Sequence, residues 1–78
     1  MSILNNIGFV YSALGEKQKA LDFYNQALPL RRAVGDKVGE ATTLNNIGRV
    51  YYAQGDVRKA LKYVSDSVDI LHELGELG

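Results

Sequence analysis

The chain has 78 residues, enough for one small domain, and its nine basic residues balance nine acidic ones. A domain of this size buries only roughly 60% of the surface of its unfolded chain, so it is marginally stable alone. Zero net charge provides no field that would attract nucleic acid or an anionic membrane surface. Cysteine is absent, which excludes disulfides and thiolate metal sites. The sequence lacks both a signal-peptide pattern and an apolar run of ~18 residues, so we expect a cytoplasmic protein.

The sequence contains an internal repeat. A shift of forty positions places LNNIGFVYSALGEKQKAL, residues 4–21, on LNNIGRVYYAQGDVRKAL, residues 44–61, with twelve identities in eighteen positions. A fixed period of this length is typical of stacked-repeat proteins, in which each repeat is one supersecondary unit. We therefore interpret the chain as two copies of one unit.

The residue pattern of the first unit predicts two helices. Apolar residues between Ile3 and Leu14 recur at spacings of three and four, which indicates a helix with one buried face over residues 2–14. Gly15 favours the left-handed conformation that ends a helix. Because the connection is short, a second helix over 17–34 should pack antiparallel to the first. Its packing residues are Ala20, Leu21, Tyr24, Ala27 and Leu28.

Two residue types inside these helices conflict with helical propensity. Gly8 and Gly48 occupy the same register of the two units, and a glycine within a helix costs about 1 kcal/mol relative to alanine. We therefore predict that a neighbouring helix approaches both glycines too closely for a Cβ. Pro29 corresponds to Asp69 of the second unit, so we expect it on the solvent side, where it kinks the helix without breaking it.

The second unit predicts two further helices, over 39–54 and 57–74. Gly35 and Gly39 bracket the turn that precedes them, which divides the chain into residues 1–38, with a shortened first helix, and residues 39–78. The last helix carries a heptad-spaced apolar row: Val57, Leu61, Val64, Val68 and Leu71. The predicted fold is all-α, with four helices in two tandem helix-turn-helix hairpins that form a fragment of an α-solenoid.

The repeated residues resemble the helix-turn-helix signature of tetratricopeptide repeats. The matching positions are Leu4, Ile7, Gly8, Tyr11, Ala20, Tyr24 and Ala27, followed by Leu44, Ile47, Gly48, Tyr51 and Ala60. The usual repeat has about 34 residues. The period of forty and the junction GDKVGEA at 35–41 resemble the repeats of kinesin light chain, of Pins-type spindle-orientation adaptors and of bacterial repeat arrays.

This resemblance implies a scaffold that binds a peptide or protein segment in a concave groove lined by the first helix of each unit. It supports Asn6, Asn46 and Arg49 as contacts, with Asn5, Phe9, Asn45 and Tyr52 as lesser candidates. An asparagine amide offers a donor and an acceptor to an extended backbone, and an arginine can bind a carboxylate through two hydrogen bonds. Alternatively, the asparagines could link neighbouring helices and Arg49 could be a solvated surface residue. Tyr51 matches Tyr11 on the packed face, so we assign it to the core.

Other chemistries have little support in the sequence. His72 lies at helical spacing from Asp69, Glu73 and Glu76, but one imidazole at a charged helix end is typical of plain surface rather than of a metal site. Acidic neighbours offset the basic residues near the starts of the second helices, so we predict no nucleic-acid partner. We also predict no enzymatic activity and no cofactor, since no catalytic triad, phosphate loop or dinucleotide fingerprint occurs.

Self-association is the alternative function. Repeat proteins usually need three or more units and polar terminal caps, whereas this sequence shows two units. Val68, Leu71 and Leu74 would then stay partly exposed on the last helix. We therefore expect a homo-oligomer, formed either by end-to-end stacking or by exchange of a hairpin after a hinge at Gly35 and Gly39 opens.

Overall fold

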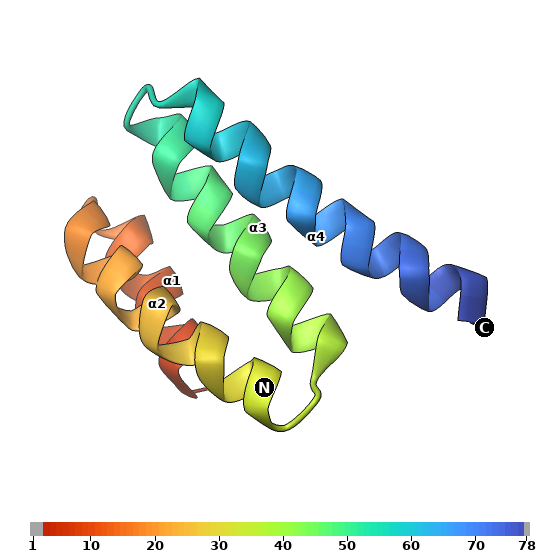
Figure 1. The fold of residues 1–78 in the computed structure, drawn as a ribbon. Coiled ribbons are helices and arrows are strands. Elements are labelled where there is room, and N and C mark those ends of the chain that lie inside the picture. The colour runs from red at the N-terminus through yellow and green to blue at the C-terminus, as the bar shows by residue number, and fades with distance from the viewer. Residues whose placement is uncertain (1–2, 78) are drawn as a thin grey trace.

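The structure is a computed structural model that describes the backbone of residues 3–77 and side chains up to residue 75. This part of the chain forms four helices: α1 (Ile3–Ala13), α2 (Lys17–Ala33), α3 (Lys37–Ala53) and α4 (Val57–Leu77). Each helix packs mainly on the next one along the chain, so that two antiparallel hairpins lie side by side through α2 and α3 (Figure 1). The predicted all-α fold with two helical hairpins is confirmed.

Three turns of one geometry connect the helices. Their glycines have positive φ values of 82° at Gly15, 71° at Gly35 and 85° at Gly55, a conformation that glycine adopts without strain. In each turn the next residue, which is acidic, donates its backbone N–H to the carbonyl five residues earlier, over 2.8 to 2.9 Å. This closure satisfies carbonyl groups that a helix end otherwise leaves without a partner.

The second turn is shorter than predicted and covers residues 34–36. α3 begins at Lys37 because Asp36 caps it: the Asp36 side chain accepts a hydrogen bond from the Gly39 N–H at 2.9 Å. Gly39 therefore belongs to the first turn of α3, and the prediction that it bounds the loop is wrong. The proposed division between residues 38 and 39 consequently falls inside this helix.

The outer ends of the predicted helices also differ from the structure. α4 extends to Leu77 rather than ending at 74, and Gly75 lies within the helix. A glycine favours a helix end without enforcing one, since only a left-handed conformation there stops the helix. The predicted start of the first helix at residue 2 lies outside the described residues.

Ion pairs tie the end of α2 to the start of α3. Arg31 Nη1 lies 3.2 Å from Asp36 Oδ2, and Arg32 Nε donates to Glu40 Oε2 over 3.0 Å. The backbone hydrogen bond from Gly39 holds the pKa of Asp36 below its usual value, and Arg31 lowers this pKa further. Asp36 is therefore ionised at neutral pH, as both its capping role and its ion pair require.

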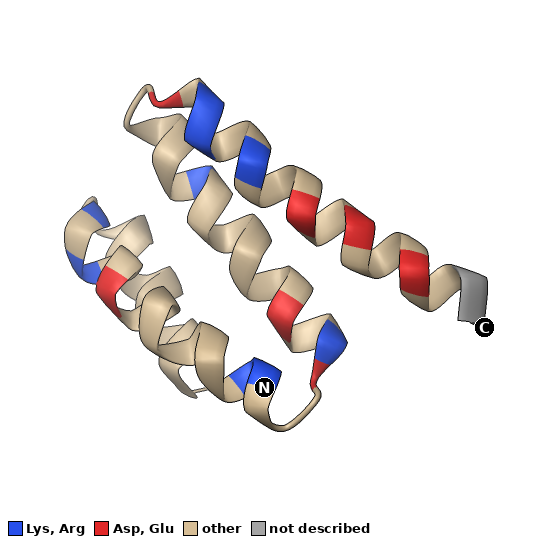
Figure 2. Cartoon of the chain, viewed as in Figure 1, with Lys and Arg blue, Asp and Glu red and all other residues tan. Residues whose placement is uncertain are grey.

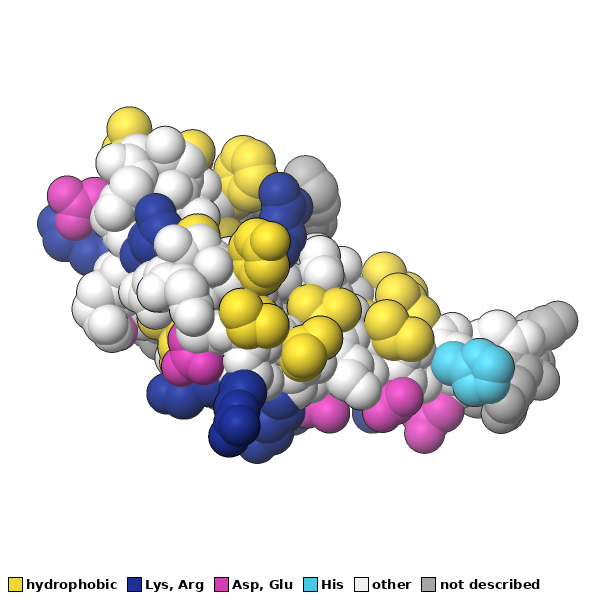
Figure 3. Space-filling model, turned by 90° about the horizontal axis from the view of Figure 1, so that it is seen from above, with side chains coloured by type: hydrophobic (Ala, Val, Ile, Leu, Met, Phe, Trp, Pro, Cys, Tyr) yellow, Lys and Arg dark blue, Asp and Glu magenta, His cyan; other side chains and the backbone are white. Residues whose placement is uncertain are grey.

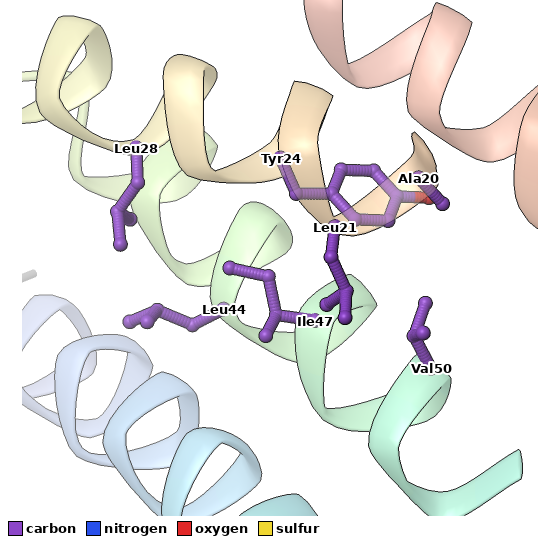
Figure 4. Close-up of a cluster of buried hydrophobic side chains, with 7 residues drawn as sticks. All are labelled: Ala20, Leu21, Tyr24, Leu28, Leu44, Ile47 and Val50. Atoms are coloured by element: carbon purple, nitrogen blue, oxygen red, sulfur yellow. The ribbon is translucent and has the colours of Figure 1, made fainter. Parts of the chain in front are cut away.

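The core lies between α2 and α3. Figure 4 shows its side chains directed into the space between these helices. The buried residues are Ala20, Leu21, Tyr24 and Leu28 of α2 with Leu44, Ile47 and Val50 of α3. The predicted packing face of α2 is thus buried, and it serves the contact between the hairpins as well as the contact inside the first hairpin.

The helix glycines mark close approaches inside each hairpin. A Cβ on Gly8 would lie 2.6 Å from Cε1 of Tyr24, and a Cβ on Gly48 would lie 2.9 Å from Cγ2 of Val64 and 3.1 Å from the carbonyl oxygen of Ala60. Favourable carbon–carbon contacts need about 3.5–4.0 Å. The predicted steric need for glycine is confirmed at both positions.

An aromatic pair repeats in the two hairpins. Tyr11 stacks on Phe23 with 5.5 Å between ring centroids, and Tyr51 stacks on Tyr63 at 5.6 Å. In each hairpin a lysine ammonium lies 5.4 or 5.2 Å from the centroid of the first tyrosine ring, within the range of a cation–π contact. Tyr51 therefore belongs to the packed face, as predicted.

Pro29 does not end α2, which continues to Ala33. Proline lacks the N–H that would bond to the carbonyl of Asn25, one turn earlier. Both residues are exposed, so water can reach this carbonyl. The predicted solvent position of Pro29 is confirmed.

Candidate functional site

A groove runs between α1 and α3, the first helices of the two hairpins. Its larger hollow has a volume of about 480 Å³ and lies between Asn5, Asn6 and Phe9 of α1 and Thr42 and Asn46 of α3. A second hollow of about 240 Å³ is lined by Phe9, Ser12, Ala13, Tyr24, Asn46 and Arg49. Because both hollows include Phe9 and Asn46, they form one continuous surface, the α1–α3 groove.

The structure brings five of the seven predicted contact residues to this groove. They are Asn5, Asn6, Phe9, Asn46 and Arg49. Asn45 is half-buried on α3 and lines neither hollow. Tyr52 lines a further hollow beside Val57 and Leu61 of α4, which borders the groove at Arg49. Asn45 and Tyr52 are therefore not groove residues in this structure.

Asn5 links two helices as well as lining the groove. The Thr43 hydroxyl lies 3.0 Å from Oδ1 of Asn5 and 2.8 Å from the carbonyl oxygen of Gly39, and its one proton serves one of these acceptors at a time. Thr43 is fully buried on α3, so its contact with Asn5 joins α1 to α3. The alternative interpretation of the asparagines, a link between helices, is confirmed for Asn5.

Asn6 and Asn46 differ from Asn5 in this respect. Asn6 is exposed and Asn46 is half-buried. No hydrogen bond holds either amide among the side chains that the structure describes. Each amide therefore keeps its donors and its acceptor available to a molecule in the groove.

The charges of the groove lie near its two ends. At one end Arg31 is paired with Asp36. At the other end Arg49 is exposed and forms no ion pair within the described part of the chain. α1 carries no charged residue, and Figure 2 shows few charges on α3. The Arg49 end is thus the more positive one.

Tyr24 lies at the Arg49 end of the groove. Burial raises the pKa of its phenol, and the positive charge of Arg49 opposes this shift. The phenol therefore stays neutral at physiological pH, and it adds no negative charge that would cancel the charge of Arg49.

The family model of the tetratricopeptide repeat matches residues 1–73, which include both hairpins and the groove. The chain belongs to the tetratricopeptide repeat family. No curated protein and no solved structure was found to match it. Tetratricopeptide repeats are protein-interaction modules and are typically not enzymes. The family thus agrees with a groove that offers amides, an arginine and an aromatic ring to a protein partner.

Sequence reasoning missed one end of the tetratricopeptide groove. This end is lined by Arg31, Asp36, Val38, Gly39 and Thr42. Asp36 and Gly39 were assigned to a loop, so their position beside α1 could not be predicted. A usable signal was present, because the pattern Ala-x-Gly-acid occurs at 13–16, 33–36 and 53–56 and predicts the same helix end each time.

Within the described side chains, no group of three histidine or acidic residues is arranged to hold a metal ion. The side chain of Glu76, which the sequence places at helical spacing from His72, lies outside the described side chains. None of the helices over residues 3–77 combines the length and apolar character needed to cross a bilayer.

Proposed function

We propose that this tetratricopeptide repeat chain binds an extended peptide or protein segment in the α1–α3 groove. The observation that carries the proposal is that the amides of Asn6 and Asn46 lie on one groove with the guanidinium of Arg49. Asparagine amides suit the alternating donors and acceptors of an extended backbone. The exposed ring of Phe9, between them, offers an apolar contact to a side chain of the segment.

The charges of the groove favour a segment with an acidic group near one end. Arg31 is already neutralised by Asp36, whereas Arg49 has no acidic partner in the described residues. A guanidinium binds a carboxylate through two parallel hydrogen bonds, which fixes orientation as well as adding affinity. We therefore propose that the acidic group of the segment lies at Arg49.

A peptide library tests this proposal. Short unstructured peptides, with and without aspartate or glutamate, are screened against the chain, and the dissociation constant of the tightest binder is measured by fluorescence anisotropy. The variant Asn46→Ala/Arg49→Ala should weaken this peptide about tenfold to a hundredfold, because a hydrogen bond to a charged group contributes about 1.5–3 kcal/mol. Acidic peptides should lose more affinity than neutral ones.

The matched control is Asn45→Ala/Arg58→Ala. It removes the same two residue types, but neither residue lines the groove, and Arg58 is exposed on α4. This variant should bind the peptide as tightly as the original chain. Circular dichroism verifies that both variants keep their helices. Equal affinity of the original chain and the Asn46/Arg49 variant would rule out the groove as the binding site.

We also propose self-association, because α4 exposes an apolar row. Val57, Leu61, Val68 and Leu71 are exposed, and Leu74 is half-buried. Figure 3 shows a band of hydrophobic side chains that extends towards His72. A contiguous apolar surface of this kind is typical of a protein-interaction site, and its removal from water contributes about 25 cal/mol per Å².

Light scattering over a range of micromolar concentrations tests self-association. A mean mass that increases with concentration is the expected result, and a chain that stays monomeric would exclude this function. Hairpin exchange is one route to such an oligomer, with Gly35 in the turn as its hinge. Gly39 could take part only if the first turn of α3 unwinds, because Asp36 caps that turn.

A further inference from the structure

We propose that copies of this chain associate head to tail, with α1 of one copy packing on α4 of the next as α3 packs on α2 within the chain. This proposal rests on the proposed self-association and specifies its geometry. Its basis is that the chain already contains one complete interface between hairpins, together with both halves of a second one on opposite ends of the molecule.

The complete interface is the one between α2 and α3. Leu21 and Leu28 of α2 are only 4% and 9% exposed, and Val50 of α3 is 2% exposed. These side chains belong to one cluster with Ile47. This interface shows how the second helix of one hairpin receives the first helix of the next.

The forty-residue repeat places equivalent side chains at the free ends. Leu61 and Val68 of α4 correspond to Leu21 and Leu28, and they are 65% and 56% exposed. Val10 of α1 corresponds to Val50 and is 55% exposed. The same positions that are buried between α2 and α3 are therefore exposed on the outer faces of α1 and α4.

Each free end also has a hollow of the size of a few side chains. On the α4 side, a hollow of about 310 Å³ lies between Gly48, Arg49 and Tyr52 of α3 and Leu61 and Val64 of α4. On the α1 side, a hollow of about 430 Å³ is lined by Ile3, Asn6, Ile7, Val10, Tyr11 and Leu14. Both surfaces are dominated by apolar side chains, as an interface that resembles the internal core requires.

The internal interface indicates what would fill the hollow on α4. In the first hairpin, the equivalent region near Ser12 and Tyr24 is bordered by Asn46 and Arg49 of α3. The equivalents of these two residues on α1 are Asn6 and Phe9. The exposed ring of Phe9 from a second copy would thus reach the hollow beside Tyr52. α1 contributes no charged residue, whereas Arg49 lines the hollow that receives it and would keep its guanidinium in water at the rim of the contact.

The repeat also predicts where this interface ends. Leu71 corresponds to Arg31, which in the internal interface contacts Asp36 before the start of α3. Asp36 lies outside the stretch of α3, from Thr43 onwards, that corresponds to the described part of α1. Of the predicted association residues, Val68 therefore lies inside the head-to-tail interface, whereas Leu71 lies beyond it.

A head-to-tail contact does not close on itself as a two-fold contact does. Each copy that joins presents a new free α4 surface and leaves a free α1 surface at the other end, so the assembly grows as an open chain. The mean mass should therefore rise continuously with concentration instead of reaching the mass of a dimer.

Complementation between two charged variants tests the proposal. Val10→Glu damages only the α1 surface, and Leu61→Glu damages only the α4 surface. Both positions are exposed, so circular dichroism should show an intact fold. Each variant alone should be monomeric in sedimentation and light scattering. An equimolar mixture should form a dimer and nothing larger, because it contains one intact α1 surface and one intact α4 surface that can meet.

A third variant, Leu71→Arg, copies the residue of the internal interface and separates two geometries, because head-to-tail packing should tolerate it whereas pairing between two α4 helices should be weakened by it. Two outcomes would show that the head-to-tail geometry is wrong while self-association stands, provided that the original chain associates. One is that Val10→Glu associates as well as the original chain, and the other is that the mixture of the two variants stays monomeric. Loss of association in Leu71→Arg would likewise overturn that geometry in favour of pairing between two α4 helices. A monomeric original chain would overturn both proposals and would leave the exposed α4 surface for another occupant.

Discussion

The substitution Ile47→Ala is expected to lower the free energy of unfolding by about 2–5 kcal/mol. Ile47 is fully buried in the cluster that joins α2 to α3. Its truncation removes apolar contacts and leaves a cavity that two packed helices fill only in part. The total stability of a small domain is about 5–15 kcal/mol, so this one change should bring the chain close to unfolding. Urea denaturation followed by circular dichroism measures the loss.

Ile7→Ala is the matched control for this prediction. Ile7 is the same residue type at the same register of the repeat, but it is only half-buried on α1. The same truncation should therefore cost clearly less at Ile7 when both variants are measured at a concentration at which the chain is monomeric. Equal losses at the two positions would contradict the assignment of the main core to the space between α2 and α3.

The repeat in the sequence was sufficient to predict the helices and most buried residues. Twelve identities at one shift indicate that the two hairpins share the same pair of helices, and spacings of three and four identify the face on which the helices of a hairpin pack. The glycine prediction succeeded for a related reason. Gly8 and Gly48 carry an intrinsic cost within a helix, and their recurrence at one register indicated a neighbour at each, which proved to be Tyr24 and Val64.

The second turn could not be read from the spacing of glycines. Gly35 and Gly39 both favour turns, but only Gly35 has a positive φ. The side chain of Asp36 decides the boundary, because its bond to the Gly39 N–H draws that glycine into α3. A capping interaction of this kind depends on one residue three positions away, and hydrophobic periodicity carries no information about it.

Several of the residues that line the groove could be predicted from the sequence, but their contacts with other helices could not. The resemblance to tetratricopeptide repeats predicts Asn5, Asn6 and Asn46 as groove residues, and the structure places all three there. The contact between Asn5 and Thr43 joins residues that are 38 positions apart, so it depends on how α1 lies against α3. The resemblance to tetratricopeptide repeats also predicts Tyr52 as a contact residue. In the structure Tyr52 lines a hollow with Val57 and Leu61 of α4, a neighbourhood that depends on how α4 packs on α3.

The close approach of Tyr24 to Gly8 predicts a large and non-additive effect. Tyr24 is almost fully buried in the core cluster, so Tyr24→Ala should lower the free energy of unfolding by about 3–5 kcal/mol, as truncation of a buried aromatic side chain does. Gly8→Ala alone should lower it by about 1–3 kcal/mol, because its Cβ would lie 2.6 Å from the Tyr24 ring. Urea denaturation of each variant measures both losses.

The double variant Gly8→Ala/Tyr24→Ala distinguishes this steric origin from a general weakness of α1. Once the ring is removed, the Cβ at position 8 has room, and the higher helical propensity of alanine should make Gly8→Ala neutral or stabilising by up to about 1 kcal/mol. Gly48→Ala in the Tyr24→Ala background is the control, since its obstacles are Val64 and the carbonyl of Ala60, and its cost should persist. If Gly8→Ala costs as much without the ring as with it, the glycine is required for another reason.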